Sequence, residues 1–171
     1  MFRVIPYIMM TIALLFVQIF VLDEISIALV LRPMIFPLVV LLLPIEWRTV
    51  WVLLVALATG VLMDVSLGGA GLYTATLLPI AVMRRWVLYL TTHRSVESGD
   101  QTSLFSRMSQ RQVMIWVATM LAIHHVMFFA LETLSFAKPL HLIATMLLST
   151  LISTLIATPI VQIYCSKIVA K

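Results

Sequence analysis

Charged residues are scarce in this chain of 171 residues. Only 11% of the residues are Asp, Glu, Lys or Arg, whereas 63% are hydrophobic. A soluble domain usually carries about 25% charged residues, so the composition excludes an ordinary soluble fold. Apolar runs of about 20 residues are what a helix needs to cross a bilayer. The composition therefore predicts a multi-pass membrane protein that forms a single transmembrane domain over residues 1–171.

The chain has a single cysteine and no glycine motif of the kind that binds phosphate. The single cysteine, Cys165, cannot form an internal disulfide and gives no metal-binding pattern. No glycine-rich loop followed by a lysine is present, which excludes a P-loop nucleotide site. The net charge of +4 would suggest nucleic acid in a soluble protein, but here its distribution between loops explains it better. We expect no nucleic-acid partner, no cofactor and no metal ion.

Apolar segments predict an all-α membrane bundle of about six transmembrane helices. In chain order, the expected spans are 4–22, 25–45, 47–65, 70–90, 112–133 and 139–165. The second span contains Arg32-Pro33 and Pro37, so its first part is a candidate for a separate interfacial helix. The one long polar stretch, 91–111, predicts a cytoplasmic loop.

The positive charges predict the orientation of the bundle. An even number of spans places both termini on one side of the membrane. If that side is the cytoplasm, it holds nine of the 11 Lys and Arg residues, and the other side holds only Arg32 and Lys138. Because cytoplasmic loops carry the excess of Lys and Arg, we expect both termini to be cytoplasmic.

Small residues and one carboxylate lie together near the end of the third span. Ala56, Gly60 and Asp64 are spaced by four and share one helix face, where small side chains let another helix approach closely. Gly71, with the glycines just before it, suits a tight hairpin. Asp64 is predicted either to cap a solvated turn or to be a buried carboxylate that locks the bundle or a partner.

Ionisable residues at membrane depth form a second candidate site, because such residues are expensive in a bilayer. His124, His125 and Glu132 lie on one broad face of the fifth span. Adjacent histidines diverge by about 100° on a helix, whereas metal-binding pairs prefer i, i+4 spacing. A proton relay would need titratable groups across the membrane, so interhelical hydrogen bonding is expected instead. We predict that Arg32, Asp64, His124 or His125, and Glu132 form one polar cluster in the outer half of the bundle.

The last span carries a row of small polar residues. Thr145, Ser149 and Ser153 are spaced by four and therefore share one helix face. Such a face is a packing surface, either inside the bundle or for a partner helix. The sequence alone leaves both alternatives open.

Two arginines and a tryptophan stand near the end of the fourth span. Arg84 and Arg85 are followed directly by Trp86. Arginine at a cytoplasmic helix end beside an aromatic residue is typical of an interfacial anchor. We therefore expect these three side chains to fix the helix end at the membrane surface.

Three stretches carry a resemblance to a known family. They are the proline-broken RPMIFPLVVLLLP, the turn motif GVLMDVSLGGAGLYTATLLPIAVMRR, and HHVMFFALETLSF followed by a Ser/Thr-rich last span. Together, and in length and helix count, they resemble the rod shape-determining protein family MreD over nearly the whole chain. The family's signature falls on Gly60, Asp64 and Gly71, with Pro33 in the broken span. The rather long polar loop at 91–111 departs from the family pattern.

The resemblance implies both a fold and a function. MreD proteins are non-catalytic, multi-pass subunits of the bacterial cytoplasmic (inner) membrane, and their fold is similar to the substrate-binding subunits of energy-coupling-factor vitamin transporters. They bind MreC, a single-span membrane protein with a periplasmic domain. Through MreC they are linked to MreB filaments and, indirectly, to peptidoglycan-synthesis enzymes. The resemblance thus implies a scaffold for cell elongation, with the signature residues structural or partner-binding.

Two other functions stay open at this point. A substrate-binding transporter subunit of the same fold would need an outward-facing cavity of about 300 Å³ or more. An intramembrane enzyme would need a Ser-His pair or paired carboxylates in reach of each other, and the spacing of this sequence predicts neither.

Overall fold

The computed structural model describes residues 5–23, 31–92, 108–133 and 139–164. The prediction of an all-α fold is confirmed, because no strand occurs in these ranges. In chain order the elements are α1 (Ile5–Val17), the π-helical turn η1 (Gln18–Leu22), α2 (Leu38–Leu41), α3 (Thr49–Leu67), α4 (Leu72–Thr92), α5 (Gln110–Thr133) and α6 (Pro139–Tyr164).

Five of the predicted spans are helices whose ends lie within two residues of the expected ones. Among the described residues, α3, α5 and α6 from Leu140 onward are long and apolar enough to cross a membrane. The polar loop predicted at 91–111 is helical at its edges, since α4 reaches Thr92 and α5 begins at Gln110. Residues 93–107 lie outside the described part of the chain.

The second predicted span is the main departure from expectation. Instead of a helix over 25–45, residues 31–37 are non-helical and α2 is a single turn, Leu38–Leu41. Pro33 and Pro37 lack a backbone N–H, and each disfavours the helical conformation of the residue before it. The interfacial helix expected at the start of this span is therefore absent from 31–37, while residues 24–30 lie outside the described ranges.

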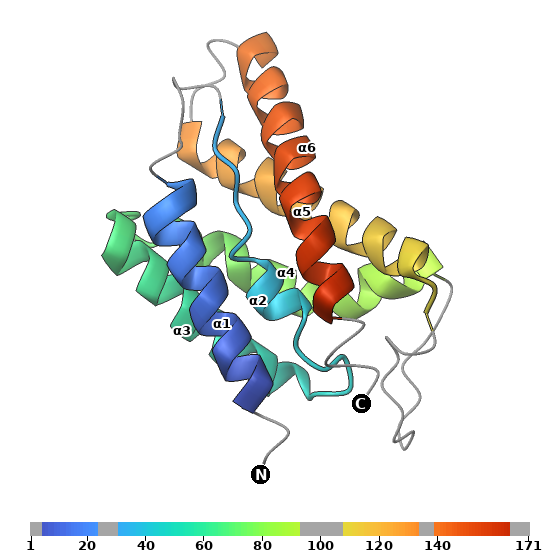
Figure 1. Cartoon of the computed structure of the whole chain (residues 1–171). Coiled ribbons are helices and arrows are strands. Elements are labelled where there is room, and N and C mark those ends of the chain that lie inside the picture. Colours follow the sequence, from blue (N-terminus) through green and yellow to red (C-terminus); the bar gives the residue numbers. More distant parts are fainter. Residues whose placement is uncertain (1–4, 24–30, 93–107, 134–138, 165–171) are drawn as a thin grey trace.

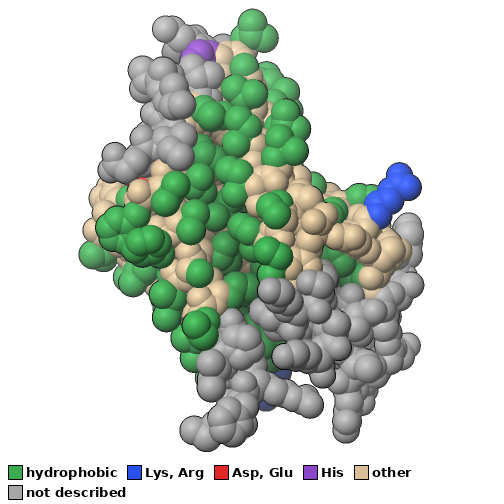
Figure 2. All heavy atoms as spheres, in the orientation of Figure 1, with side chains coloured by type: hydrophobic (Ala, Val, Ile, Leu, Met, Phe, Trp, Pro, Cys, Tyr) green, Lys and Arg blue, Asp and Glu red, His purple; other side chains and the backbone are tan. Residues whose placement is uncertain are grey.

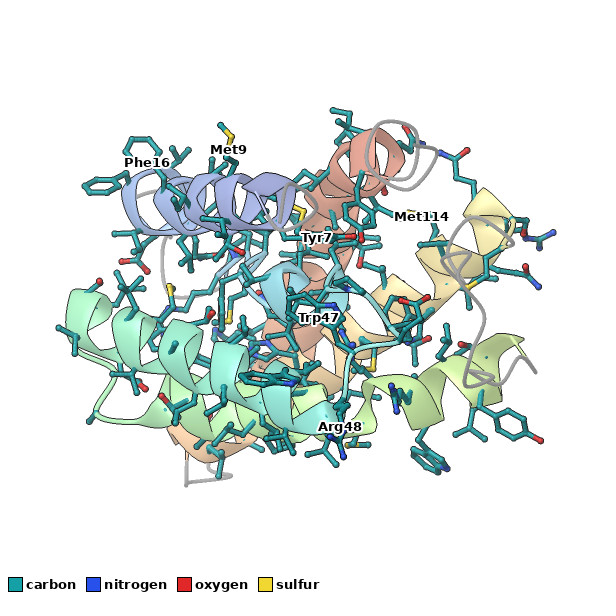
Figure 3. All side chains as sticks on the ribbon, turned by 90° about the horizontal axis from the view of Figure 1, so that it is seen from below. Tyr7, Met9, Phe16, Trp47, Arg48 and Met114 are labelled. Carbon is teal, nitrogen blue, oxygen red and sulfur yellow. The ribbon has the colours of Figure 1, made fainter. Side chains whose placement is uncertain are left out.

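Helices that follow one another in the chain pack against one another in the order α3, α4, α5, α6. Figure 1 shows the non-helical stretch and α2 running between α1 and α6, with α4 and α5 behind them. Seen from below in Figure 3, α2 lies near the centre, with α1 on one side of it and α3 and α4 on the other. The middle of the fold is therefore occupied by residues 31–41, which are non-helical up to residue 37 and form the single turn α2 after it.

Residues 31–45 are called the inner segment below. Ile35, Phe36 and the stretch 38–42 are 0% exposed, and they contribute to both of the clusters of buried apolar side chains. This segment reads as apolar on every side because neighbouring elements surround it.

The outer surface is apolar as well. Figure 2 shows that hydrophobic side chains and little charge cover the face formed by α1 and α6. A soluble monomer rarely exposes apolar patches of this extent, so the surface matches a lipid environment. Large exposed side chains include Ile8, Met9, Ile12 and Phe16 on α1, Phe20 on η1, and Leu147, Leu151 and Leu155 on α6.

Candidate functional site

The inner segment poses a hydrogen-bonding problem that the rest of the chain must solve. Backbone N–H and C=O groups outside a helix have no partner within their own element, and in lipid each unsatisfied group costs several kcal/mol. Non-helical chain is therefore tolerated at membrane depth only where protein or water satisfies it. Side chains from η1, α4 and α6 do so here, supported by two side chains of α5, and together they define the candidate functional site.

Gln18, in the turn η1, binds the first half of the inner segment from one side. Its Oε1 accepts hydrogen bonds from the backbone N–H of Ile35 at 2.7 Å and of Phe36 at 3.3 Å. Its Nε2 donates to the carbonyl of Pro33 at 3.2 Å. The side chain is only 3% exposed, so its donor and its acceptor serve the inner segment together.

Sequence reasoning missed Gln18. The available signal was its position as the only amide side chain within the apolar run 4–22, because polar residues in membrane spans are costly and usually functional. The π-helical geometry of η1 is a further indication, since such turns occur frequently at functional sites.

Two serines of α6 bind the segment from the opposite side. The hydroxyl of Ser149 accepts a hydrogen bond from the N–H of Arg32 at 3.1 Å, and that of Ser153 accepts one from Met34 at 2.8 Å. Both serines are 0% exposed. Thr145, one turn earlier, is also buried and donates to a carbonyl of its own helix, His141. The small-residue row of the last span is therefore internal to this fold.

His125 extends this contact toward α5. Its Nδ1 lies 2.7 Å from the carbonyl of Leu121, which can only accept, so Nδ1 carries the proton. Nε2 then accepts a hydrogen bond from the hydroxyl of Ser153 at 3.2 Å. The imidazole of His125 thus completes a chain of contacts from α5 through α6 to the backbone of the inner segment.

Arg84 and Arg85 bind the other end of the inner segment. Arg84, 1% exposed, donates to the carbonyls of Val40 at 2.8 Å, Leu43 at 3.2 Å and Pro44 at 2.6 Å. These carbonyls lie in and just after the short helix α2, where the last carbonyls of a helix lack intrahelical partners and favour a cation.

The expectation that Arg84 anchors the chain at the membrane surface is therefore wrong. Arg84 is buried, and Arg85 uses Nε and Nη2 to donate to the carbonyls of Ile45 at 3.1 Å and Trp47 at 2.9 Å. Trp86 is different, since its side chain is 59% exposed, and its role as an anchor stays a prediction.

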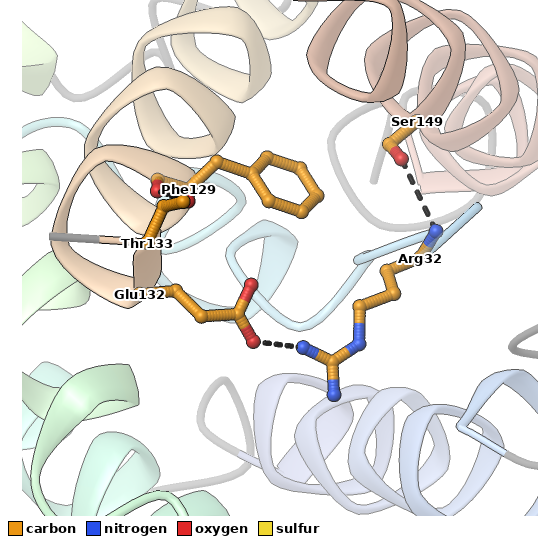
Figure 4. Close-up of polar contacts among 5 residues, drawn as sticks. All are labelled: Arg32, Phe129, Glu132, Thr133 and Ser149. Atoms are coloured by element: carbon orange, nitrogen blue, oxygen red, sulfur yellow. Dashed lines mark hydrogen bonds and ion pairs between the residues drawn. The ribbon is translucent and has the colours of Figure 1, made fainter. Parts of the chain in front are cut away.

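An ion pair stands at the beginning of the inner segment. The guanidinium of Arg32 binds the carboxylate of Glu132 near the end of α5, and both side chains are partly exposed (Figure 4). The same residue, Arg32, holds Ser149 through its backbone. The ion pair and this hydrogen bond therefore tie the inner segment to α5 and α6 at the same place.

Asp64 caps the start of α4. Its carboxylate accepts from the backbone N–H of Tyr73 and of Thr74, each at 3.0 Å, and from the Thr74 hydroxyl at 2.6 Å. Gly60, one turn earlier, packs so closely that an added Cβ would lie 2.6 Å from the Cα of Thr74. The carboxylate acts as a helix cap within the α3–α4 hairpin.

The glycines and Ala56 complete this hairpin. Gly71 has a φ of +92°, which side chains rarely adopt, so the turn needs glycine there. Ala56 is 0% exposed and lies in the cluster of buried side chains that includes Val52 and Met63. Along with Gly60, it therefore faces the interior of the described bundle.

His124 lies beside these networks without joining them. It is 0% exposed, and neither ring nitrogen has a hydrogen-bond partner among the described residues. Its ring meets Phe36 edge-on, with centroids 5.1 Å apart, and stacks on Phe128 at 6.1 Å. His124 therefore packs as an aromatic side chain.

The single polar cluster predicted from the sequence is divided into separate sets of contacts. Arg32 pairs with Glu132, His125 bonds Ser153, and Asp64 caps α4. The inner segment connects the first two sets, and Asp64 has no hydrogen bond to either. Within the described residues no three His, Cys, Asp or Glu side chains are grouped as a metal ion would require.

Comparison of the chain with protein-family models, with curated proteins and with solved structures found no match.

Proposed function

We propose that this chain is a non-enzymatic, multi-pass scaffold of the MreD type in the bacterial inner membrane. In this role it binds a single-span, MreC-like protein and helps to couple cytoskeletal filaments to peptidoglycan synthesis. The supporting observation is what fills the interior of the fold. The fold's centre is filled by its own inner segment, and Gln18, Ser149, Ser153, His125 and Arg84 are occupied in holding that segment.

The inner segment also supplies the second of six membrane crossings in this proposal. An extended chain advances about 3.3 Å per residue, whereas an α-helix advances 1.5 Å per residue. Residues 31–35, which form neither turn nor helix, would advance about 16 Å, and residues 36–42, which are turns and α2, about 10 Å more. The segment therefore approaches the thickness of a hydrocarbon core of about 30 Å. The number of crossings stays even, and both termini lie in the cytoplasm as the charge distribution predicts.

A substrate-binding transporter subunit is the alternative, and the same observation disfavours it. That function needs an outward-facing cavity of about 300 Å³ or more. Ile35, Phe36 and the stretch 38–42 lie at the centre with no exposed surface. Opening a cavity there would break the hydrogen bonds that Gln18 and Arg84 make.

The partner would meet an outer helix face in this proposal. The small residues that suggested a docking groove, Gly60 and Ser153, face inward. A photocrosslinker at Leu151, exposed on α6, and one at Leu57, exposed on α3, distinguish between the outer faces of these two helices. A buried control at Ala157 should give no crosslink.

Co-purification tests the function directly. The full chain, tagged and extracted in mild detergent, should retain an MreC-like single-span protein from the same source. An unrelated single-span protein expressed at the same level serves as the control. Failure to retain the first, or equal retention of both, would overturn the scaffold proposal, and tight binding of a vitamin-like molecule by calorimetry would favour the alternative.

A further inference from the structure

An open pocket borders the start of α3. It has a volume of about 440 Å³ and is lined by Glu46, Trp47, Arg48 and Trp51. This volume lies within the range of about 300–1,000 Å³ that is typical of small-molecule sites. Arg48 is exposed and Trp51 is 60% exposed, so the pocket opens at the surface of the molecule.

Hydrogen bonds hold the backbone of the pocket in place before any ligand binds. Arg84 donates to the carbonyl of Pro44, and Arg85 donates to those of Ile45 and Trp47. The ring of Tyr7, from α1, lies beside the turn, with its centroid 6.3 Å from that of a Trp47 ring (Figure 3). A ligand therefore loses little binding energy in ordering the site.

Two groups at the pocket could bind an anion, Arg48 and the start of α3. The Arg48 guanidinium, at the start of α3, has no hydrogen-bond partner among the described residues. The lining itself carries one guanidinium, that of Arg48, and one carboxylate, that of Glu46. Arg84 and Arg85 hold the carbonyls of Pro44, Ile45 and Trp47, so these carbonyls are already bound by cations. The first turn of α3 adds unpaired N–H groups and the positive end of the helix dipole.

The walls suit an amphiphile rather than a free anion. The indoles of Trp47 and Trp51 each have an apolar body and one polar N–H, which is why tryptophan gathers at membrane interfaces. From Trp51 a row of exposed apolar residues continues along one face of α3 through Leu54 and Val61. An acyl chain can lie along this row while its headgroup occupies the pocket.

We propose that this pocket binds the headgroup of an anionic phospholipid. The phosphate lies against Arg48 and the first turn of α3, the two indoles flank the glycerol region, and an acyl chain follows Leu54 and Val61. The site needs only that the chain lies in a bilayer, so it is independent of the MreC-like partner. Loss of lipid selectivity and loss of partner co-purification are therefore separate results.

Native mass spectrometry of the full, delipidated chain tests the site. Phosphatidylglycerol and phosphatidylcholine with identical acyl chains are offered at equal concentration. The wild type should retain phosphatidylglycerol preferentially, and Arg48→Ala should lower that retention about fivefold, the effect of one arginine at an anionic surface. Arg48→Lys, which keeps the charge, should retain most of the binding. Arg111→Ala, which removes an exposed arginine at the start of α5, should change nothing.

Three outcomes would overturn the assignment. The first is equal retention of the two lipids by the wild type. The second is an equal loss of phosphatidylglycerol in Arg48→Ala and Arg111→Ala, which would indicate a diffuse charge effect. The third is displacement of the lipid by millimolar inorganic phosphate, which would make this a phosphate site. Within the described ranges the Arg48 side chain makes no hydrogen bond that these substitutions would remove, so the Arg48 variants should give the wild-type gel-filtration profile.

Discussion

The backbone N–H of Met34 donates a 2.8 Å hydrogen bond to the hydroxyl of Ser153, 119 residues further along the chain. This contact joins the inner segment to the last helix at a point where both residues are buried. The same hydroxyl serves His125 on α5. One small side chain thus satisfies two buried groups on two other elements, which makes Ser153 a sensitive position.

Ser153→Ala should destabilise the protein by about 1–3 kcal/mol, because it leaves the N–H of Met34 buried without a partner. Thr154→Ala is the matched control, since the hydroxyl of Thr154 bonds only a carbonyl of its own helix. We expect the control to change stability by less than about 0.5 kcal/mol. Unfolding in SDS titrations measures both, and equal effects would contradict the role given to Ser153.

Gln18→Leu should be more damaging than Ser153→Ala. It removes the partner of two buried N–H groups and one carbonyl, each costing about 1–3 kcal/mol when unsatisfied, so poor yield of folded protein is expected. Thr11→Val is the control, because the hydroxyl of Thr11 on the preceding helix α1 donates only to the carbonyl of Tyr7 in that same helix, and this variant should express normally. The yield of monodisperse protein on gel filtration measures the difference, and a normal yield of Gln18→Leu would show that η1 does not hold the inner segment.

Replacing each of the two adjacent histidines by leucine should affect thermal stability differently. His124→Leu removes two ring nitrogens that lack partners and keeps an apolar side chain of similar size, so thermal stability should be unchanged or higher. His125→Leu should lower it by about 1–2 kcal/mol, because the hydroxyl of Ser153 loses its acceptor. Thermal unfolding of the two variants side by side gives the comparison. A loss of stability in His124→Leu would indicate that His124 has a partner outside the described contacts.

The topology can be tested with the native cysteine. Cys165 lies just after α6 and is the only cysteine of the chain, so a membrane-impermeant maleimide should label it only in inside-out vesicles. Ser135→Cys in a Cys165→Ser background places a thiol between α5 and α6, and it should be labelled only from the outer side. Labelling of both positions from the same side would contradict an odd number of crossings between them.

The sequence identified the long helices because their apolar runs needed no information from elsewhere in the chain. The bounds of α3 to α6 agree with the predicted spans within two residues. Proline positions also indicated that the second span was irregular. They did not reveal that 31–37 would be non-helical at the centre of the fold, because that conformation depends on partners supplied by other helices.

The polar residues also divide into those that the sequence placed correctly and those whose position depends on other helices. Sequence spacing placed Gly60 and Asp64 correctly on one face, since a cap and its hairpin are local features. It assigned Arg84 to the membrane surface because a cationic side chain near an aromatic residue usually lies there, and it passed over Gln18.

What the sequence by itself determined is an all-helical, apolar chain with a positive-charge bias, because composition and periodicity act locally. Only the tertiary structure decided which polar groups meet. The backbone of the inner segment must be satisfied inside the protein, and its partners, Gln18, Ser149, Ser153 and Arg84, come from three separate helical elements.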